Sequence, residues 1–149
     1  MKRFFRSIAM IPNRFTDRDQ WLCAWDGNHD CYNFIMGERL ETESFRECVE
    51  RETCWVLGLE RRDILVANMA QVNLEYQDVL PGETDPSHIA VAFYSIHLYG
   101  KNARQVVREF TEGAWLSRPE LTNGRAEDGR IVSPVLTYLL QKADVIPKC

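Results

Sequence analysis

The stretch of residues 37–59, GERLETESFRECVERETCWVLGL, constrains the fold more than any other part of this chain. Ser44 with Glu47 three residues later is a capping-box pattern, in which each side chain accepts a hydrogen bond from the other residue's backbone N–H. Gly58 is well suited to end a helix, because glycine adopts the left-handed conformation without strain. The spacing therefore predicts a helix that opens at Ser44, extends to about Leu57 and stops at Gly58.

Successive residues of a helix lie about 100° apart, which divides this one into two faces. We interpret the first face as a solvated acidic surface, because Glu43, Glu47 and Glu50 share it. The opposite face is an apolar stripe that contains one carboxylate: Phe45, Cys48, Val49, Glu52, Trp55 and Val56. An unpaired buried carboxylate is costly and tends to become protonated. We therefore expect Glu52 to have a partner, a metal or a route to water.

The rest of the chain alternates strands with short helices. Apolar runs predict strands at residues 3–11, 21–25, 32–36, 64–72, 89–98 and 110–116. The Asp-Gly and Asn residues at 26–30 predict a hairpin turn between the second and third of these runs. Further helices are expected at residues 102–108, at a capping-box turn from Ser117, and from Ser133-Pro134 to about Asp144. This order predicts an α+β fold with a mixed sheet.

Length and composition limit the class of protein. A chain of 149 residues fits one compact domain, so we expect residues 1–149 to form a single domain. The formal net charge of −4 argues against a nucleic acid as the default partner. No segment approaches the roughly 20 apolar residues of a membrane span. We expect no membrane partner.

The N-terminus and the cysteines bear on the compartment. MKRFFRSIAMIPNRF begins like a signal peptide, but Arg6 and Pro12 interrupt it before an apolar core develops. We interpret it as the first strand of a cytoplasmic protein. Cys23 and Cys31 flank the predicted turn, and we do not expect a disulfide between them in that compartment. The sequence contains no C-x-x-C unit, which argues against a zinc site. The chain has five cysteines, so any full pairing leaves one unpaired: Cys23, Cys31, Cys48, Cys54 and Cys149.

The spacing in residues 37–59 resembles the box of the Nudix superfamily. That box is glycine, five residues, glutamate, seven residues, Arg-Glu, an aliphatic, any residue, Glu-Glu, any residue, glycine and an aliphatic. Thr53 replaces the first aliphatic, and Trp55 and Val56 replace the paired glutamates. The resemblance extends outside the box to residues 113–121, GAWLSRPEL, which are similar to the family's late strand, tryptophan and short helix. Six positions match the box: Gly37, Glu43, Arg51, Glu52, Gly58 and Leu59.

The resemblance implies an α/β/α sandwich that hydrolyses nucleoside diphosphate derivatives with Mg²⁺ or Mn²⁺. It implies that Glu52 is the remaining catalytic and metal-binding residue. Magnesium needs several oxygen ligands, and Trp55 and Val56 offer none, so we expect metal binding to be weak or absent. The other matched residues are expected to maintain the fold, with Glu43 and Arg51 bracing the loop–helix–loop: Gly37, Glu43, Arg51, Gly58 and Leu59.

Three functions remain open on the sequence. The preferred hypothesis is a degenerate Nudix domain that binds a nucleotide-like or phosphate ligand, or a protein partner. The alternative is an active hydrolase with substitute ligands from loops, and the third is a structural module in which Trp55 fills the former metal site. A homodimer is possible, since dimers are common in the family.

Possible substitute metal ligands are the loop acids Glu83, Asp85, Glu109, Glu112, Glu127 and Asp128, although each is more simply interpreted as a solvated side chain. We interpret His88 and His97 as ordinary sheet residues. The aromatic side chains that could stack on a nucleotide base are Trp21, Trp25, Phe34 and Tyr76.

Overall fold

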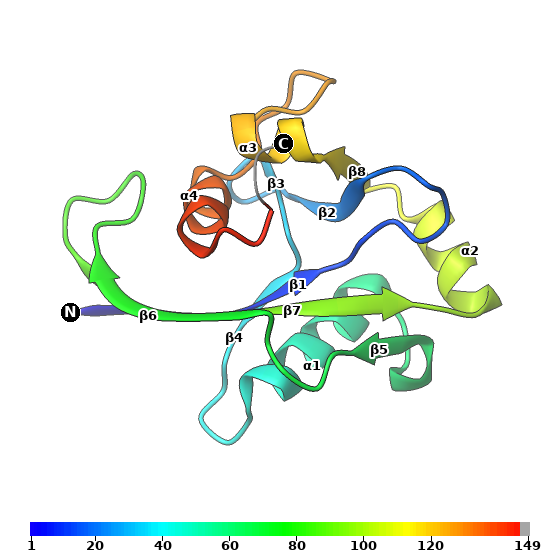
Figure 1. Ribbon diagram of the computed structural model, residues 1–149, viewed down its shortest axis with the longest axis horizontal. Helices are drawn as coiled ribbons and strands as arrows, with labels where there is room; N and C mark the ends of the chain where they lie inside the picture. Colours follow the sequence, from blue (N-terminus) through cyan, green and yellow to red (C-terminus); the bar gives the residue numbers. More distant parts are fainter. Residues whose placement is uncertain (147–149) are drawn as a thin grey trace.

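The computed structural model describes residues 1–146, which form two β-sheets and their covering helices (Figure 1). The strands are β1 (Lys2–Met10), β2 (Gln20–Asp26), β3 (Cys31–Asn33), β4 (Met36–Glu38), β5 (Ile64–Val66), β6 (Val72–Asp78), β7 (Ser87–Leu98) and β8 (Gly113–Ser117). The helices are α1 (Phe45–Leu57), the 3-10 turn η1 (Arg61–Asp63), α2 (Lys101–Glu109), α3 (Arg118–Asn123) and α4 (Pro134–Ala143).

The larger sheet is mixed, and β7 lies at its centre. Its order is β4-β1-β7-β5, and β6 also pairs with β7. β1 runs parallel to β7, with Lys2 opposite Ser87 and Met10 opposite Ser95. β4, β5 and β6 are antiparallel to their neighbours. β7 is buried along most of its length because strands flank it on both edges and side chains cover both of its faces.

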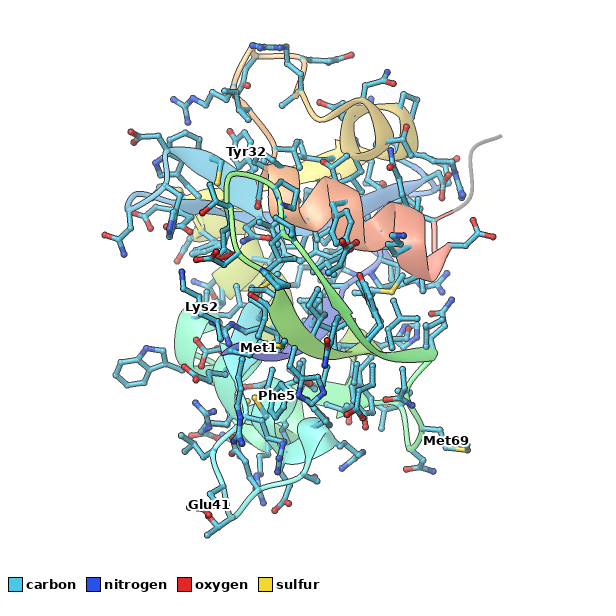
Figure 2. All side chains as sticks on the ribbon, turned by 90° about the vertical axis from the view of Figure 1, so that its left-hand side faces the viewer. Met1, Lys2, Phe5, Tyr32, Glu41 and Met69 are labelled. Atoms are coloured by element: carbon cyan, nitrogen blue, oxygen red, sulfur yellow. The ribbon has the colours of Figure 1, made fainter. Side chains whose placement is uncertain are left out.

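The smaller sheet has the antiparallel order β3-β2-β8. In Figure 1 this sheet lies with α3 and α4 on one side of the larger sheet, and α1 lies on the other. Figure 2 shows the same separation from the side, with Tyr32 in the upper part of the molecule and Glu41 at the lower tip. Two hydrophobic clusters fill the layers, one including Phe93 and Leu136 and the other Val49 and Tyr94.

The predicted α+β class with a mixed sheet is confirmed. The strand expected at 110–116 begins only at Gly113, as β8, and two other runs were wrong in their boundaries. The run expected as one strand at 64–72 is split into β5 and the start of β6, separated by a turn at residues 67–71. The two pieces pair with β7 at different positions along that strand: Val66 lies opposite Ile96, and Val72 lies opposite Phe93. A short apolar run does not reveal such a break, because each half alone has strand character.

The second wrong boundary concerns residues 32–36. The hairpin itself is confirmed, since Trp25 pairs with Tyr32 and Asp26 with Cys31. The second strand ends at Asn33, however, and Met36 joins the larger sheet opposite Ile8. The backbone N–H of Ala9 donates to the Ile35 carbonyl at 2.8 Å, which fixes this transfer between sheets.

The four described cysteines are free thiols. Cys23 lies opposite Ala114 on β8 and Cys31 opposite Asp26 on β2, so the two do not face each other across the hairpin. Burial raises the pKa of the Cys23 thiol and holds it in the neutral form. Cys149 lies outside the described residues. Within residues 1–146, no helix combines the length and apolar character that a membrane crossing requires.

Candidate functional site

The boundaries of α1 follow from its caps. Ser44 Oγ accepts the backbone N–H of Glu47 at 3.0 Å, and the Glu47 carboxylate accepts the Ser44 N–H at 2.9 Å. At the other end Gly58 has φ 68°, and its N–H reaches the Cys54 carbonyl. The predicted helix is confirmed at both ends. These local interactions set the position of every residue between 44 and 58.

Arg51 connects the helix to the loop before it. Its guanidinium donates to both Glu43 carboxylate oxygens, at 2.7 and 3.1 Å, and to the Glu38 carbonyl at 3.2 Å. Glu43 also accepts the backbone N–H of Leu40 at 2.9 Å. We call Glu38, Leu40, Glu43 and Arg51 the brace. It ties the end of β4 and the β4–α1 loop to the second turn of α1.

The charges of the brace reinforce each other. The hydrogen bonds from Arg51, with the Leu40 N–H, lower the pKa of Glu43 from 4.5 to about 2. The Glu43 carboxylate in turn raises the pKa of Arg51. The Cys48 thiol, buried beneath this pair, has its pKa raised to about 11 by burial and by the Glu43 charge. The brace is therefore ionised across the ordinary pH range, with a neutral thiol below it.

Glu52 lies at the junction of α1 and β4. Its carboxylate accepts a hydrogen bond from Arg51 Nη1 at 3.1 Å, and 24% of its side chain remains exposed. It thus has both a partner and a route to water. A Cβ atom at Gly37 would lie 3.1 to 3.2 Å from Glu52 Cβ, Cγ and Oε2, so the glycine lets the carboxylate lie directly against β4.

The residues at the next two positions point in different directions. Trp55 is 81% exposed, so the prediction that it belongs to the apolar stripe was wrong, as was the suggestion that it fills a former metal site. It follows Arg51 by one turn and shares that outer face of the helix. Val56 is half-buried and packs against the cluster that contains Val49. The buried stripe of α1 is Cys48, Val49, Thr53 and Leu57.

The acidic face predicted for α1 is only partly solvated. Glu50 pairs with Arg61 of η1 at 3.0 Å, and its side chain is 17% exposed. Glu47 is used in the helix cap, and Glu43 belongs to the brace. A shallow hollow on the outer face of α1 is lined by several of these groups together with Trp55 and Leu59. Its carboxylates are mostly engaged with cations or backbone N–H groups.

Three of the loop acids contact residues other than Glu52. Glu83 pairs with Lys2 at 3.2 Å, Glu109 accepts from Gln105, and Asp128 accepts from the Tyr32 hydroxyl at 2.9 Å. Within residues 1–146 there is no group of three His, Cys, Asp or Glu side chains placed to hold a metal ion.

The two strand histidines have sheet neighbours. His88 contacts Glu75 at 2.8 Å and the edge of the Phe5 ring, and His97 lies opposite Leu65. These contacts fit the interpretation of both as ordinary sheet residues.

The four aromatics proposed for base stacking already have packing partners. Phe34 is fully buried, and Trp25 meets Tyr32 edge-on under the guanidinium of Arg130. Trp21 lies under Arg118. Tyr76 donates from its hydroxyl to Tyr138 at 2.9 Å.

A different aromatic and basic region lies between the loop at residues 12–19, α2 and β8, and it was not predicted from the sequence. Phe15 and Trp115 meet edge-on there with ring centroids 6.2 Å apart, and Arg104 and Arg108 lie on the adjoining face of α2. The spacing of the two arginines by one helical turn was the available signal. The packing of a distant loop against α2 was not readable from that spacing.

No protein-family profile matches the sequence, and no curated protein is significantly similar to it. The fold, in contrast, matches solved structures across nearly the whole chain. An Ap4A hydrolase from C. elegans aligns with 94% of this chain and 95% of its own, at a TM-score of 0.61 and 11% identity. The Nudix hydrolase RenU from M. smegmatis covers 99% of this chain and 90% of its own, at a TM-score of 0.55 and 12% identity.

A third similar structure is NrtR from Shewanella oneidensis, with a TM-score of 0.64 and 14% identity. It covers 95% of this chain, which spans only 62% of the NrtR chain. NrtR has also been crystallised with a 27mer DNA. The agreement in architecture, together with the brace and the capped α1, leads to one conclusion. This chain has the Nudix fold.

Proposed function

We propose that the chain is a Nudix-fold protein that binds a nucleotide-like or phosphate ligand, or a protein partner, with weak or no hydrolysis. The observation that carries the proposal is the chemistry of one turn of α1. Of the positions at which active family members are expected to hold metal, only Glu52 has a carboxylate, and Arg51 already pairs with it. Trp55 is directed to solvent and Val56 into the apolar layer.

The donor set does not fit Mg²⁺ or Mn²⁺ as a tightly held cofactor. Such ions prefer several oxygen ligands in octahedral geometry, and a carboxylate bound to a guanidinium is a weaker ligand. Glu52 with water could hold a divalent ion only loosely. We therefore derive no metal-dependent step for this chain, and we assign Glu52 as the residue on which any remaining hydrolysis depends.

The presence of the brace supports a ligand-binding protein over a purely structural module. Glu43 and Arg51 still hold the β4–α1 loop against the helix, so the surface next to Glu52 keeps a fixed shape. Two of the similar structures add support for the ligand class, since both are hydrolases and one is an Ap4A hydrolase.

Phosphate release separates binding from hydrolysis. The purified chain is incubated with Mg²⁺ or Mn²⁺ and a panel of nucleoside diphosphate derivatives, beside Glu52→Gln. The proposal expects slow release at most, and a thermal shift with nucleotide that does not need metal. Multiple-turnover release that requires Mg²⁺ or Mn²⁺ and is lost in Glu52→Gln would instead establish the alternative, an active hydrolase with substitute metal ligands. Arg62→Ala, on the exposed side of η1, serves as the control variant.

A further inference from the structure

A groove between α2 and β8 has the composition of a ligand site. It is a hollow of about 450 Å³ at the surface, with the loop at residues 12–19 forming its third side. This size lies within the usual range for small-molecule sites, roughly 300–1,000 Å³. Its walls are mainly apolar, with Leu22, Val107 and Phe110 beside the aromatic rings. We call it the α2–β8 groove.

The aromatic wall of the groove is held in place by the loop that carries it. The buried Asn13 accepts the Phe15 backbone N–H at 3.1 Å, and its amide donates to the Gln20 side chain at 3.1 Å. The backbone N–H of Asn13 also donates to the Gln20 carbonyl at 2.9 Å. Phe15 therefore meets Trp115 of β8 from a loop whose two ends are joined. Both rings are half-buried, so each keeps some surface open to the hollow.

The rim of the groove is cationic. The Arg104 guanidinium lies 5.3 Å from the centre of the Phe15 ring, and Arg108 follows one turn later. A second hollow shares Phe15 and Arg104 and adds Arg14 and Lys101. Within residues 1–146, none of these four cations has a carboxylate within ion-pair distance. In a chain with net charge −4, four exposed cations without acidic partners form a local basic surface.

An aromatic surface and guanidinium groups without carboxylate partners recognise complementary parts of one ligand. Planar rings stack on aromatic side chains, and arginine binds phosphate with two parallel hydrogen bonds. We propose that the α2–β8 groove binds a nucleoside monophosphate, with the base against Phe15 and Trp115 and the phosphate at Arg104 and Arg108. This inference rests on the proposed function for the ligand class and adds the place of binding. It involves no metal, no residue of the brace and no covalent step.

Calorimetric titration of the whole chain with AMP tests the proposal. Adenosine, inorganic phosphate and a short single-stranded oligothymidylate are titrated in parallel. The double variant R104A/R108A is expected to weaken AMP binding by about tenfold or more, because two charge-assisted contacts are lost. Phe15→Leu is expected to weaken AMP and adenosine by about fivefold or more and to leave phosphate binding unchanged, because only stacking is lost. Arg62→Ala should match the unaltered chain, since Arg62 lies on η1 outside the groove.

The outcomes separate this proposal from the proposed function. AMP binding that is unchanged in R104A/R108A overturns the groove and leaves the binding function standing. No detectable binding of AMP or any other nucleotide overturns the groove and removes the nucleotide from the proposed function, which then keeps only a phosphate ligand or a protein partner. Metal-dependent hydrolysis lost in Glu52→Gln, with AMP affinity still reduced in R104A/R108A, overturns the proposed function and supports the groove. Tighter binding of the oligothymidylate than of AMP overturns the assignment to a free nucleotide. Circular dichroism of each variant separates lost binding from lost folding.

Discussion

The two ends of the segment 37–59 are held by different forces. At the start, Glu43 and Glu52 both pair with Arg51, and the loop backbone joins the same network. At the end, Val56 and Leu59 pack inward while Trp55 remains 81% exposed. Charge holds the first end and apolar burial the second. A solvent-facing position at the second end can therefore change without loss of the fold, and Trp55, one of the positions at which this chain departs from the Nudix box, is such a position.

The largest expected effect is at the start of the segment. Arg51→Ala removes the donors to Glu43, Glu52 and the Glu38 carbonyl. Hydrogen bonds to charged groups contribute about 1.5–3 kcal/mol each when shielded and less when exposed. We expect the free energy of unfolding in urea to fall by about 2 kcal/mol. Arg61→Ala, which removes an ion pair at a more exposed guanidinium, should cost less than about 1 kcal/mol. Equal losses in both variants would mean that the brace is no stronger than a surface pair.

The same network predicts how stability depends on pH. The folded pKa of Glu43 is about 2 and its ordinary value 4.5, so folding favours its ionised form. This contribution is complete above the ordinary value and is lost as the pH falls through the folded one. We expect the unfolding free energy to decline between pH 5 and 2, as urea titrations at successive pH values would show. Arg51→Ala should flatten that decline, and a profile of unchanged slope would contradict the assignment to Glu43.

The contact between β4 and α1 gives a smaller effect. Gly37→Ala would place a Cβ atom 3.1 Å from Glu52 Cγ and 3.2 Å from its Oε2. Glu52 must then shift, at a cost of about 1–2 kcal/mol in the free energy of unfolding. Gly27→Ala is the control, because a Cβ there meets nothing within 4 Å. If Gly37→Ala unfolds at the same urea concentration as Gly27→Ala, the close contact between Gly37 and Glu52 does not contribute to stability.

One substitution on the buried face of α1 is expected to stabilise the protein. Thr53 is fully buried and its hydroxyl has no hydrogen-bond partner among the described residues. Thr53→Val keeps the shape and removes the unpaired polar group, so we expect a gain of about 1 kcal/mol. In Thr122 the hydroxyl donates to the Arg118 carbonyl at 3.0 Å, and Thr122→Val should not stabilise. Thermal melting of both variants makes the comparison, and a lower melting temperature for Thr53→Val would show that its hydroxyl is bonded in solution.

The smallest effect is expected at Trp55. Trp55→Ala removes a side chain that buries little surface, so its unfolding free energy should change by less than about 0.5 kcal/mol. Such a small change in the free energy of unfolding would contrast with the large loss expected for Arg51→Ala, four residues earlier on the same helix. A loss as large as that of Arg51→Ala would show that the indole is packed in solution.

The sequence was sufficient where interactions are local. Ser44, Glu47 and Gly58 define α1 through bonds that span a few residues, and the structure has the helix at the predicted bounds. Ser117 with Glu120 and Ser133 with Pro134 similarly mark α3 and α4. Such caps are readable because donor, acceptor and spacing all lie within one turn.

The sequence was insufficient where distant segments decide. The orientation of Trp55 depends on how α1 rotates against β1 and β4, and hydrophobicity alone placed it inside. The split of residues 64–72 depends on pairing with β7. The α2–β8 groove forms only because Asn13 brings Phe15 back to Trp115, and those two residues are far apart in the chain.

The parallel pairing of β1 with β7 sets an order of events during synthesis. β1 begins at Lys2, and the strand that gives it a parallel neighbour begins only at Ser87. A nascent chain cannot complete the larger sheet until β7 has left the ribosome, whereas α1 carries its own caps and can form long before. The apolar side of β1 must therefore be shielded by other means during that interval, which makes the early chain the stage at which aggregation is most easily provoked.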